Sequence, residues 1–166
     1  MSGIQITVDL RDLDDAIKGL RAFLDVDREE LLTTIGSAGV DQTQHRINDE
    51  KTAPDGTPWQ PNRAGTPTLN ASGKHLLKDI AFNADADQVE WGSPWQFAHV
   101  HQEGMVIKPR YGHALKFWYV AGGNVNFAVA KQVTIPARPF LGLSNDNVDE
   151  LLDIVTDAFG MLGGHP

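Results

Sequence analysis

The chain contains no cysteine among its 166 residues. Disulfides, thiolate catalysis, iron–sulfur clusters and cysteine-based zinc sites are therefore excluded, and the composition is typical of a protein made in a reducing cytoplasm. No apolar run reaches the roughly 18 residues of a membrane span, and residues 1–10 lack the basic and apolar parts of a signal peptide. The content of 41% hydrophobic and 22% charged residues indicates a globular protein.

An excess of positive charge is also missing, because the formal net charge is −8. Phosphate backbones are bound by cations that displace counterions, so stable nucleic-acid binding is not expected. Residues 1–51 hold 6 Lys/Arg and 11 Asp/Glu, residues 52–143 hold 8 and 6, and residues 144–166 hold 0 and 5. Two interpretations of these acidic ends remain open: solvated helix faces, or surfaces for head-to-tail contact with the basic middle of another copy.

The acidic ends have the periodicity of helices. Apolar residues three or four apart predict helices over residues 9–24, 27–51 and 144–162. Asp27 and Glu30 have the spacing of a capping box, and three candidate caps begin the last helix: Ser144, Asn145 and Asp146. Gly36 and Gly39 lie near one another on one helix face, where we expect that another backbone can approach closely.

Residues 52–73 break this regularity. Four prolines and three glycines predict a long irregular loop with a turn at Pro54-Asp55-Gly56. The loop carries Trp59, a large apolar side chain in a polar stretch. Trp59 either folds back on its own domain or waits for a partner surface.

The middle of the chain has the pattern of strands. Residues 78–84 and 88–92 predict a short hairpin, and residues 114–120 and 125–135 a longer one around the turn Ala121-Gly122-Gly123-Asn124. Apolar residues at period two place one set of side chains on a common face of the last strand: Val125, Phe127, Val129, Val133 and Ile135. Lys131 interrupts this face, which suggests that the strand leaves the core before its end.

These elements predict the α+β class. We expect two N-terminal helices, a small antiparallel sheet of two hairpins with an inserted short helix (residues 94–103), and a C-terminal helix. The length favours a single domain over residues 1–166. Its expected parts are a helical part (9–51), a loop and short helix (52–77), a β-rich part (78–143) with a projecting hairpin (114–135), and the last helix (144–162).

The residues that could carry chemistry do not form a known catalytic pattern. His99 and Glu103 lie four apart and share a helix face, as two metal ligands do, with His113 or His75 as a third ligand. The HExxH spacing is absent, and no serine lies in a GxSxG turn. A partly buried histidine beside Trp95 and Phe97, hydrogen-bonded to the backbone, explains this segment better than a metal site does. We expect no enzyme activity and no cofactor.

The most specific segment is IPARPFLGLS at residues 135–144. Two prolines three apart favour an extended chain that ends the sheet and gives Arg138 a defined direction. One interpretation is a stiff connector between strand and helix, with Arg138 paired to a local acid. The other places Arg138 and Phe140 at a subunit boundary, where arginine and aromatic residues are enriched.

This segment, followed by an acidic helix, resembles the C-terminal signature of the phage virion morphogenesis family. The resemblance covers roughly residues 30–160. It includes PDGTPWQP (54–61), LNASGKHLLKDI (69–80), VEWGSPWQFAHVHQEG (89–104) and HALKF (113–117). Two departures are Glu103, where a phenylalanine is more usual, and AGGNVNFAVAKQ, which lengthens the hairpin.

The resemblance implies a structural role in the virion tail or neck, for a protein made in the host cytoplasm. Family members complete the tail and help to join it to the head, often as rings, with neck, tail-tube or connector proteins as partners and DNA only passing through. Six copies are the number that the resemblance implies. The candidate assembly interface comprises Trp59, Trp118, Phe127, Arg138, Pro139, Phe140 and Leu141. Two alternatives remain: a soluble binding module that presents the Trp59 loop, and a metal-dependent hydrolase using His99 and Glu103.

Overall fold

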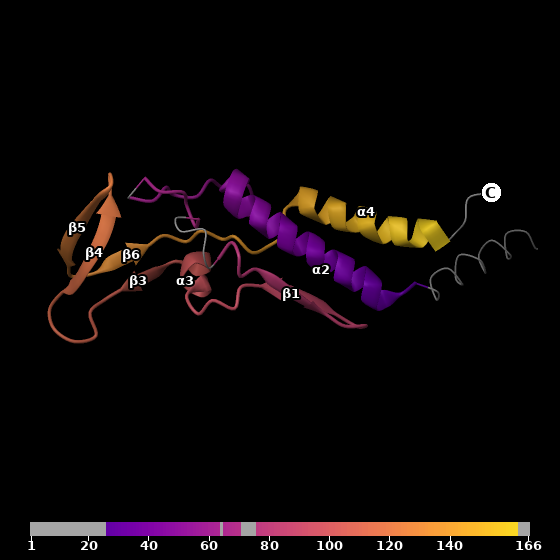
Figure 1. The fold of residues 1–166 in the computed structure, drawn as a ribbon, viewed down its shortest axis with the longest axis horizontal. Coiled ribbons are helices and arrows are strands. Elements are labelled where there is room, and N and C mark those ends of the chain that lie inside the picture. The colour runs from indigo at the N-terminus through magenta and orange to yellow at the C-terminus, as the bar shows by residue number, and fades with distance from the viewer. Residues whose placement is uncertain (1–25, 64, 71–75, 163–166) are drawn as a thin grey trace, which may run out of the picture.

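The computed structural model describes residues 26–63, 65–70 and 76–162. The predicted helix over residues 9–24 lies outside them, as does His75. The described chain is elongated, and its central element is helix α2 (Arg28–His45), which lies between helix α4 (Asn145–Leu162) and strand β1 (Ala81–Ala84) (Figure 1). No helix in the described ranges has both the length and the apolar character needed to cross a membrane.

The start of α2 confirms the predicted cap. The side chain of Asp27 accepts hydrogen bonds from the backbone N–H groups of Glu29 and Glu30, each at 3.1 Å, and thereby satisfies donors that have no partner inside the helix. After α2 the chain continues as a π-helical segment, η1 (Arg46–Glu50), and Lys51 ends it with a positive φ of 55°. Helical structure therefore covers the range expected from the sequence.

The glycine face of α2 is covered by aromatic side chains, not by a backbone. Strands β1 and β2 (Val89–Gly92) form an antiparallel hairpin that packs on this face. A Cβ atom at Gly39 would lie 2.6 Å from the Trp91 ring, and one at Gly36 would lie 2.3 Å from the Phe82 ring. The prediction of a close approach is confirmed, but the approaching group was wrong, because the two small residues make room for rings.

Helix α4 packs on α2 on the side away from this hairpin (Figure 1). Its cap is reciprocal: the Ser144 hydroxyl accepts from the Asn147 N–H, and the Asn147 Oδ1 accepts from the Ser144 N–H, both at 3.2 Å. Gln42 of α2 donates to the Glu150 carboxylate at 2.6 Å. This helix confirms the predicted range of residues 144–162.

The strands do not form one sheet. Besides β1–β2, strand β3 (Met105–Ile107) pairs with β6 (Val133–Ile135), and β4 (Leu115–Ala121) pairs with β5 (Asn124–Ala130). The predicted strand over residues 125–135 is therefore wrong: it breaks at Lys131 and Gln132, and its two parts take different partners. Strand β3 was missed because three exposed residues carry too little pattern.

The core lies where the irregular loop of residues 52–73 meets the segment between β6 and α4. We call that segment, residues 136–144, the connector. Helix α3 (Ala98–Glu103) begins four residues later than predicted and ends at Gly104 as expected. Trp59 folds back on its own chain, with 8% of its surface exposed. The buried apolar cluster consists of Ile47, Ala53, Trp59, Leu76, Ile80, Ala98 and Phe140.

Candidate assembly interface

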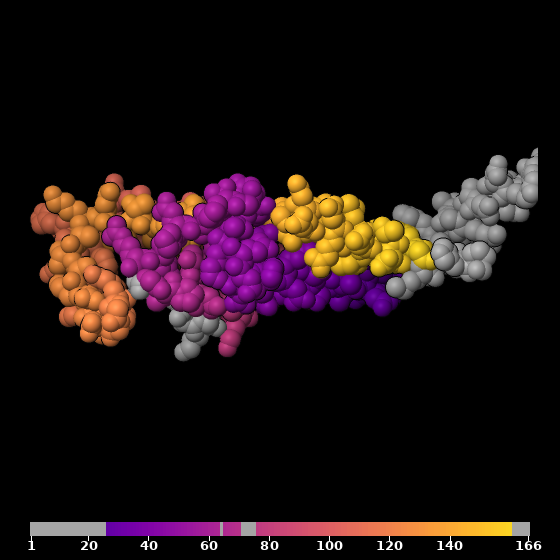
Figure 2. All heavy atoms as spheres, turned by 90° about the horizontal axis from the view of Figure 1, so that it is seen from above, coloured from indigo at the N-terminus to yellow at the C-terminus, as the bar shows by residue number. Residues whose placement is uncertain are grey.

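The hairpin β4–β5 projects from one end of the described chain, opposite α4 (Figures 1 and 2). Its turn, Gly122-Gly123, has φ values of 58° and 79°. Positive φ at both central residues is what a two-residue type I′ turn requires, and glycine adopts it without strain. A turn of this type matches the right-handed twist of the two strands that it joins.

One face of this hairpin is apolar and open to solvent. Trp118 lies opposite Phe127, and Val120 lies opposite Val125; the two aromatic rings are 4.8 Å apart. Trp118 is 70% exposed and Phe127 is 50% exposed. We define the hairpin face as Trp118, Val120, Val125, Phe127 and Val129. The predicted common face is confirmed for Val125, Phe127 and Val129, although the described part of the chain does not bury them; Val133 and Ile135, expected on the same face, belong to β6 and pair with β3 instead.

The remaining predicted interface residues are used inside the chain. Trp59, Arg138 and Phe140 are buried, and Pro139 and Leu141 are half-buried. The indole Nε1 of Trp59 donates to the Pro139 carbonyl at 3.1 Å. Arg138 donates from Nε to the Gln60 carbonyl at 2.9 Å, so its partner is the loop backbone and not the expected local acid. Of the seven residues, Trp118 and Phe127 are the exposed ones.

Helix α3 holds the connector by a contact that sequence reasoning missed. The Gln102 side chain donates to the Leu141 carbonyl at 3.0 Å and accepts from the N–H groups of Phe140 and Leu141 at 3.0 and 3.1 Å. Gly104 allows this approach, because a Cβ there would lie 2.7 Å from the backbone nitrogen of Ala137. The His-Gln-x-Gly sequence was the available signal, and its glutamine is one of the residues that hold the connector in place.

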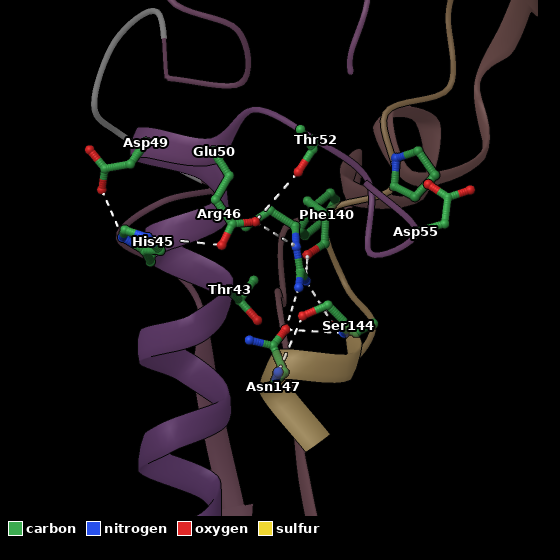
Figure 3. A network of polar contacts seen from close by, with 12 residues as sticks. Thr43, His45, Arg46, Asp49, Glu50, Thr52, Asp55, Phe140, Ser144 and Asn147 are labelled. Carbon is green, nitrogen blue, oxygen red and sulfur yellow. Dashed lines mark hydrogen bonds and ion pairs between the residues drawn. The ribbon is translucent and has the colours of Figure 1, made fainter. Parts of the chain in front are cut away.

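Arg46 joins three elements at the other side of the connector (Figure 3). Arg46 is fully buried. The guanidinium donates to the carbonyls of Phe140 and Gly142 at 3.1 and 2.7 Å and to the Asn147 side chain. Its Nε lies 3.6 Å from a Glu50 oxygen. Burial lowers the pKa of Arg46 from its ordinary value. The sequence offered no signal for this network, since Arg46 stands in a polar stretch of the helix.

The partly buried histidine expected beside Trp95 is His101, but its buried Nδ1 atom does not make the expected hydrogen bond to the backbone of the described residues. The two rings stack at a centroid distance of 5.7 Å, and the Nδ1 atom of His101 is buried without a hydrogen-bond partner among the described residues. Burial, and secondarily the charge of Arg138, lower the pKa of His101 from 6.5. The folded chain therefore favours the neutral imidazole.

Mild acid should destabilise the protein through His101. Above pH 6.5, the ordinary pKa, the histidine is neutral in both states and this contribution is complete. As the pH falls below that value, the unfolded chain takes up the proton first, so the free energy of unfolding decreases until the lowered folded-state pKa is passed. We expect the melting temperature to fall across this window in wild type and to fall less in His101→Gln. Equal slopes in the two proteins would contradict the assignment.

The arrangement of His99 and Glu103 does not make a metal site. Both side chains are exposed, on opposite ends of the short helix α3. No three His, Asp or Glu side chains come together as metal ligands within the described ranges. The shallow depression over β1 and β2 is lined by Ala81, Phe82, Asn83, Glu90, Trp91, Gly92, Ser93 and Pro94. Glu90 is the one titratable group in that lining.

Comparison with known proteins agrees with the resemblance in the sequence. A sequence model of the phage virion morphogenesis family matches residues 8–160. No curated protein and no solved structure matches the chain significantly. Since the match covers nearly the whole chain, including the connector and the projecting hairpin, the protein belongs to the phage virion morphogenesis family, a structural family of phage assembly.

Proposed function

We propose that this protein completes the tail of a tailed phage or prophage and helps to join the tail to the head as part of an oligomeric neck ring. Family membership supports a role in virion morphogenesis. The observation that carries the finer role is the hairpin face, which presents five large apolar side chains to solvent at the tip of a projecting element. Apolar patches of this kind are typical of sites that bind another protein.

The hairpin face would contact the next copy in the ring. A closed ring needs a heterologous interface, in which one surface meets a different surface of the neighbour. Trp118 and Phe127 supply the aromatic centre of such a contact, where binding energy is usually concentrated. The other five predicted residues support this contact indirectly, because their interactions hold in place the connector, which leads from β6 to α4. They are Trp59, Arg138, Pro139, Phe140 and Leu141.

The net charge of −8 per copy suits a ring through which DNA passes. An acidic lumen repels phosphates, so DNA slides instead of adhering, and the repulsion weakens as salt screens it. The binding-module alternative has lost its support, because the Trp59 side chain that it would present is buried. The hydrolase alternative has no observation in its favour.

Particles made without this protein test the proposal. We expect separate DNA-filled heads and unfinished tails by electron microscopy, with joining restored when the protein is supplied. Purified wild type should form a species larger than a monomer in light scattering, and it should not bind DNA tightly at about 0.15 M salt. Intact, infectious particles in its absence would contradict the proposal.

A further inference from the structure

Charge is separated along the described chain. Residues 104–139, which contain β3, β4, β5 and β6, hold five Lys/Arg and no Asp/Glu. Residues 140–162, which contain α4, hold five Asp/Glu and no Lys/Arg. The hairpin and α4 lie toward opposite ends of the elongated structure (Figures 1 and 2). Opposite charges at opposite ends favour contact between copies in a head-to-tail sense.

The hairpin face carries its positive charge at one edge. Lys116 precedes Trp118 by two residues, so it lies on the same face of β4. Lys131 follows Val129 by two residues, directly after β5. Between these two lysines, residues 117–130 contain no charged side chain. The surface is therefore apolar in its centre and positive at its base.

Helix α4 carries the complementary arrangement. Val148 and Leu152 lie four residues apart on one helix face, and Leu152 is 56% exposed. Asp149 and Asp153 each follow by one residue, about 100° further around the helix, and both are exposed. We define the α4 ridge as Val148, Asp149, Leu152 and Asp153. It presents an apolar line with acids along one side.

We propose that the hairpin face of one copy docks on the α4 ridge of the next copy. This inference rests on the proposed ring and names the two surfaces that form it. The apolar residues of both surfaces lose contact with water, while Lys116 and Lys131 meet Asp149 and Asp153. Because the two surfaces lie at opposite ends of the chain, the hairpin face of one copy cannot reach the α4 ridge of the same copy. The contact is therefore made with another copy and repeats from copy to copy.

Reciprocal charge reversal tests this pairing. One variant carries Lys116→Glu and Lys131→Glu, so both of its surfaces are acidic; the other carries Asp149→Lys and Asp153→Lys, so both are basic. Each variant alone should lose the assembled species, with an apparent dissociation constant raised at least tenfold. An equimolar mixture should recover it, because every acidic surface then meets a basic one. Circular dichroism and thermal melting check that each variant is folded before mixing.

The outcomes separate this inference from the proposed function. Wild type that remains monomeric at all concentrations would overturn the ring itself. A second outcome is that wild type assembles, but the basic variant also assembles normally or the mixture recovers no assembled species. That result would overturn docking on the α4 ridge and leave the proposed ring unaffected. If either variant fails to fold, the single substitution Leu152→Ser takes its place, and unchanged assembly of that protein would equally overturn the docking.

Cross-linking provides a second measurement, made simple by the absence of native cysteine. The variant carrying Val120→Cys and Leu152→Cys should give, on oxidation, a ladder of covalent multimers in denaturing gels. The two single-cysteine variants are the controls and should not extend beyond dimers. Efficient dimers from Val120→Cys alone, without a ladder from the double variant, would show that hairpins pair with each other and would overturn the proposal.

Discussion

Replacing Arg46 with methionine is expected to lower the free energy of unfolding by about 3–5 kcal/mol, because hydrogen bonds from a charged donor contribute about 1.5–3 kcal/mol each. Methionine keeps most of the apolar stem but none of the donors. The carbonyls of Phe140 and Gly142 would lose the hydrogen bonds at 3.1 and 2.7 Å, and the Phe140 carbonyl, which is buried, would be left unsatisfied at a cost of about 1–3 kcal/mol. Urea denaturation of the two proteins measures the difference.

The control for Arg46→Met is Glu50→Gln on the same segment. Glu50 lies 3.6 Å from the Arg46 Nε, but its side chain reaches solvent, so its loss should cost less than about 1 kcal/mol. Arg46→Lys keeps the charge and not the planar fork, so it should fall between the two. Equal destabilisation by Arg46→Met and Glu50→Gln would show that the buried hydrogen bonds contribute nothing beyond the ion pair.

Removal of the hairpin face is expected to abolish assembly without unfolding the chain. Trp118→Ser with Phe127→Ser should weaken association by about 2–4 kcal/mol, or about 30- to 1000-fold in the dissociation constant, as for aromatic residues at interface centres. Deletion of residues 118–127 should leave a folded monomer. Since no other helix or strand of the described chain packs extensively on β4 and β5, the melting temperature should change little. Light scattering over a concentration series measures both effects.

A matched control exists outside the hairpin face. Tyr111 is 82% exposed and precedes β4, so Tyr111→Ser removes an exposed aromatic ring of similar size from the same region. We expect its oligomer to match wild type. An unchanged oligomer after deletion of residues 118–127 would refute the role of the hairpin, and equal losses in Tyr111→Ser would mean that general surface hydrophobicity drives association.

Local patterns anticipated much of the fold because they report interactions between near neighbours. Asp27 caps α2 and Ser144 caps α4, since each satisfies donors within three residues of itself. The turn between β4 and β5 could be predicted from its two glycines, because this type of turn depends on positive φ values at those two residues alone. The pairing of strands could not be predicted in this way. Strand β6 pairs with β3 across 25 intervening residues (108–132), and no pattern of neighbouring residues indicates that partner.

The candidate interface shows the same division. Period two placed Phe127 on a common face with Val125 and Val129, but it could not say whether another element covers that face. Trp59 and Trp118 are the same residue type, and only their surroundings distinguish a buried anchor from an exposed contact. Arg138 was expected to find an acid nearby, whereas its acceptor, the Gln60 carbonyl, comes from a loop 78 residues away.

The sequence by itself determined the helices with their caps, the irregular loop, the tight turn, the separation of charge and the family. These properties depend on composition or on residues close together in the chain. Tertiary structure alone decided which aromatic residues stay exposed, which glycines receive rings, and that Arg46 and Gln102 fasten the connector. Burial and long-range hydrogen bonds depend on what the fold brings against each residue, and that information is spread over the whole chain.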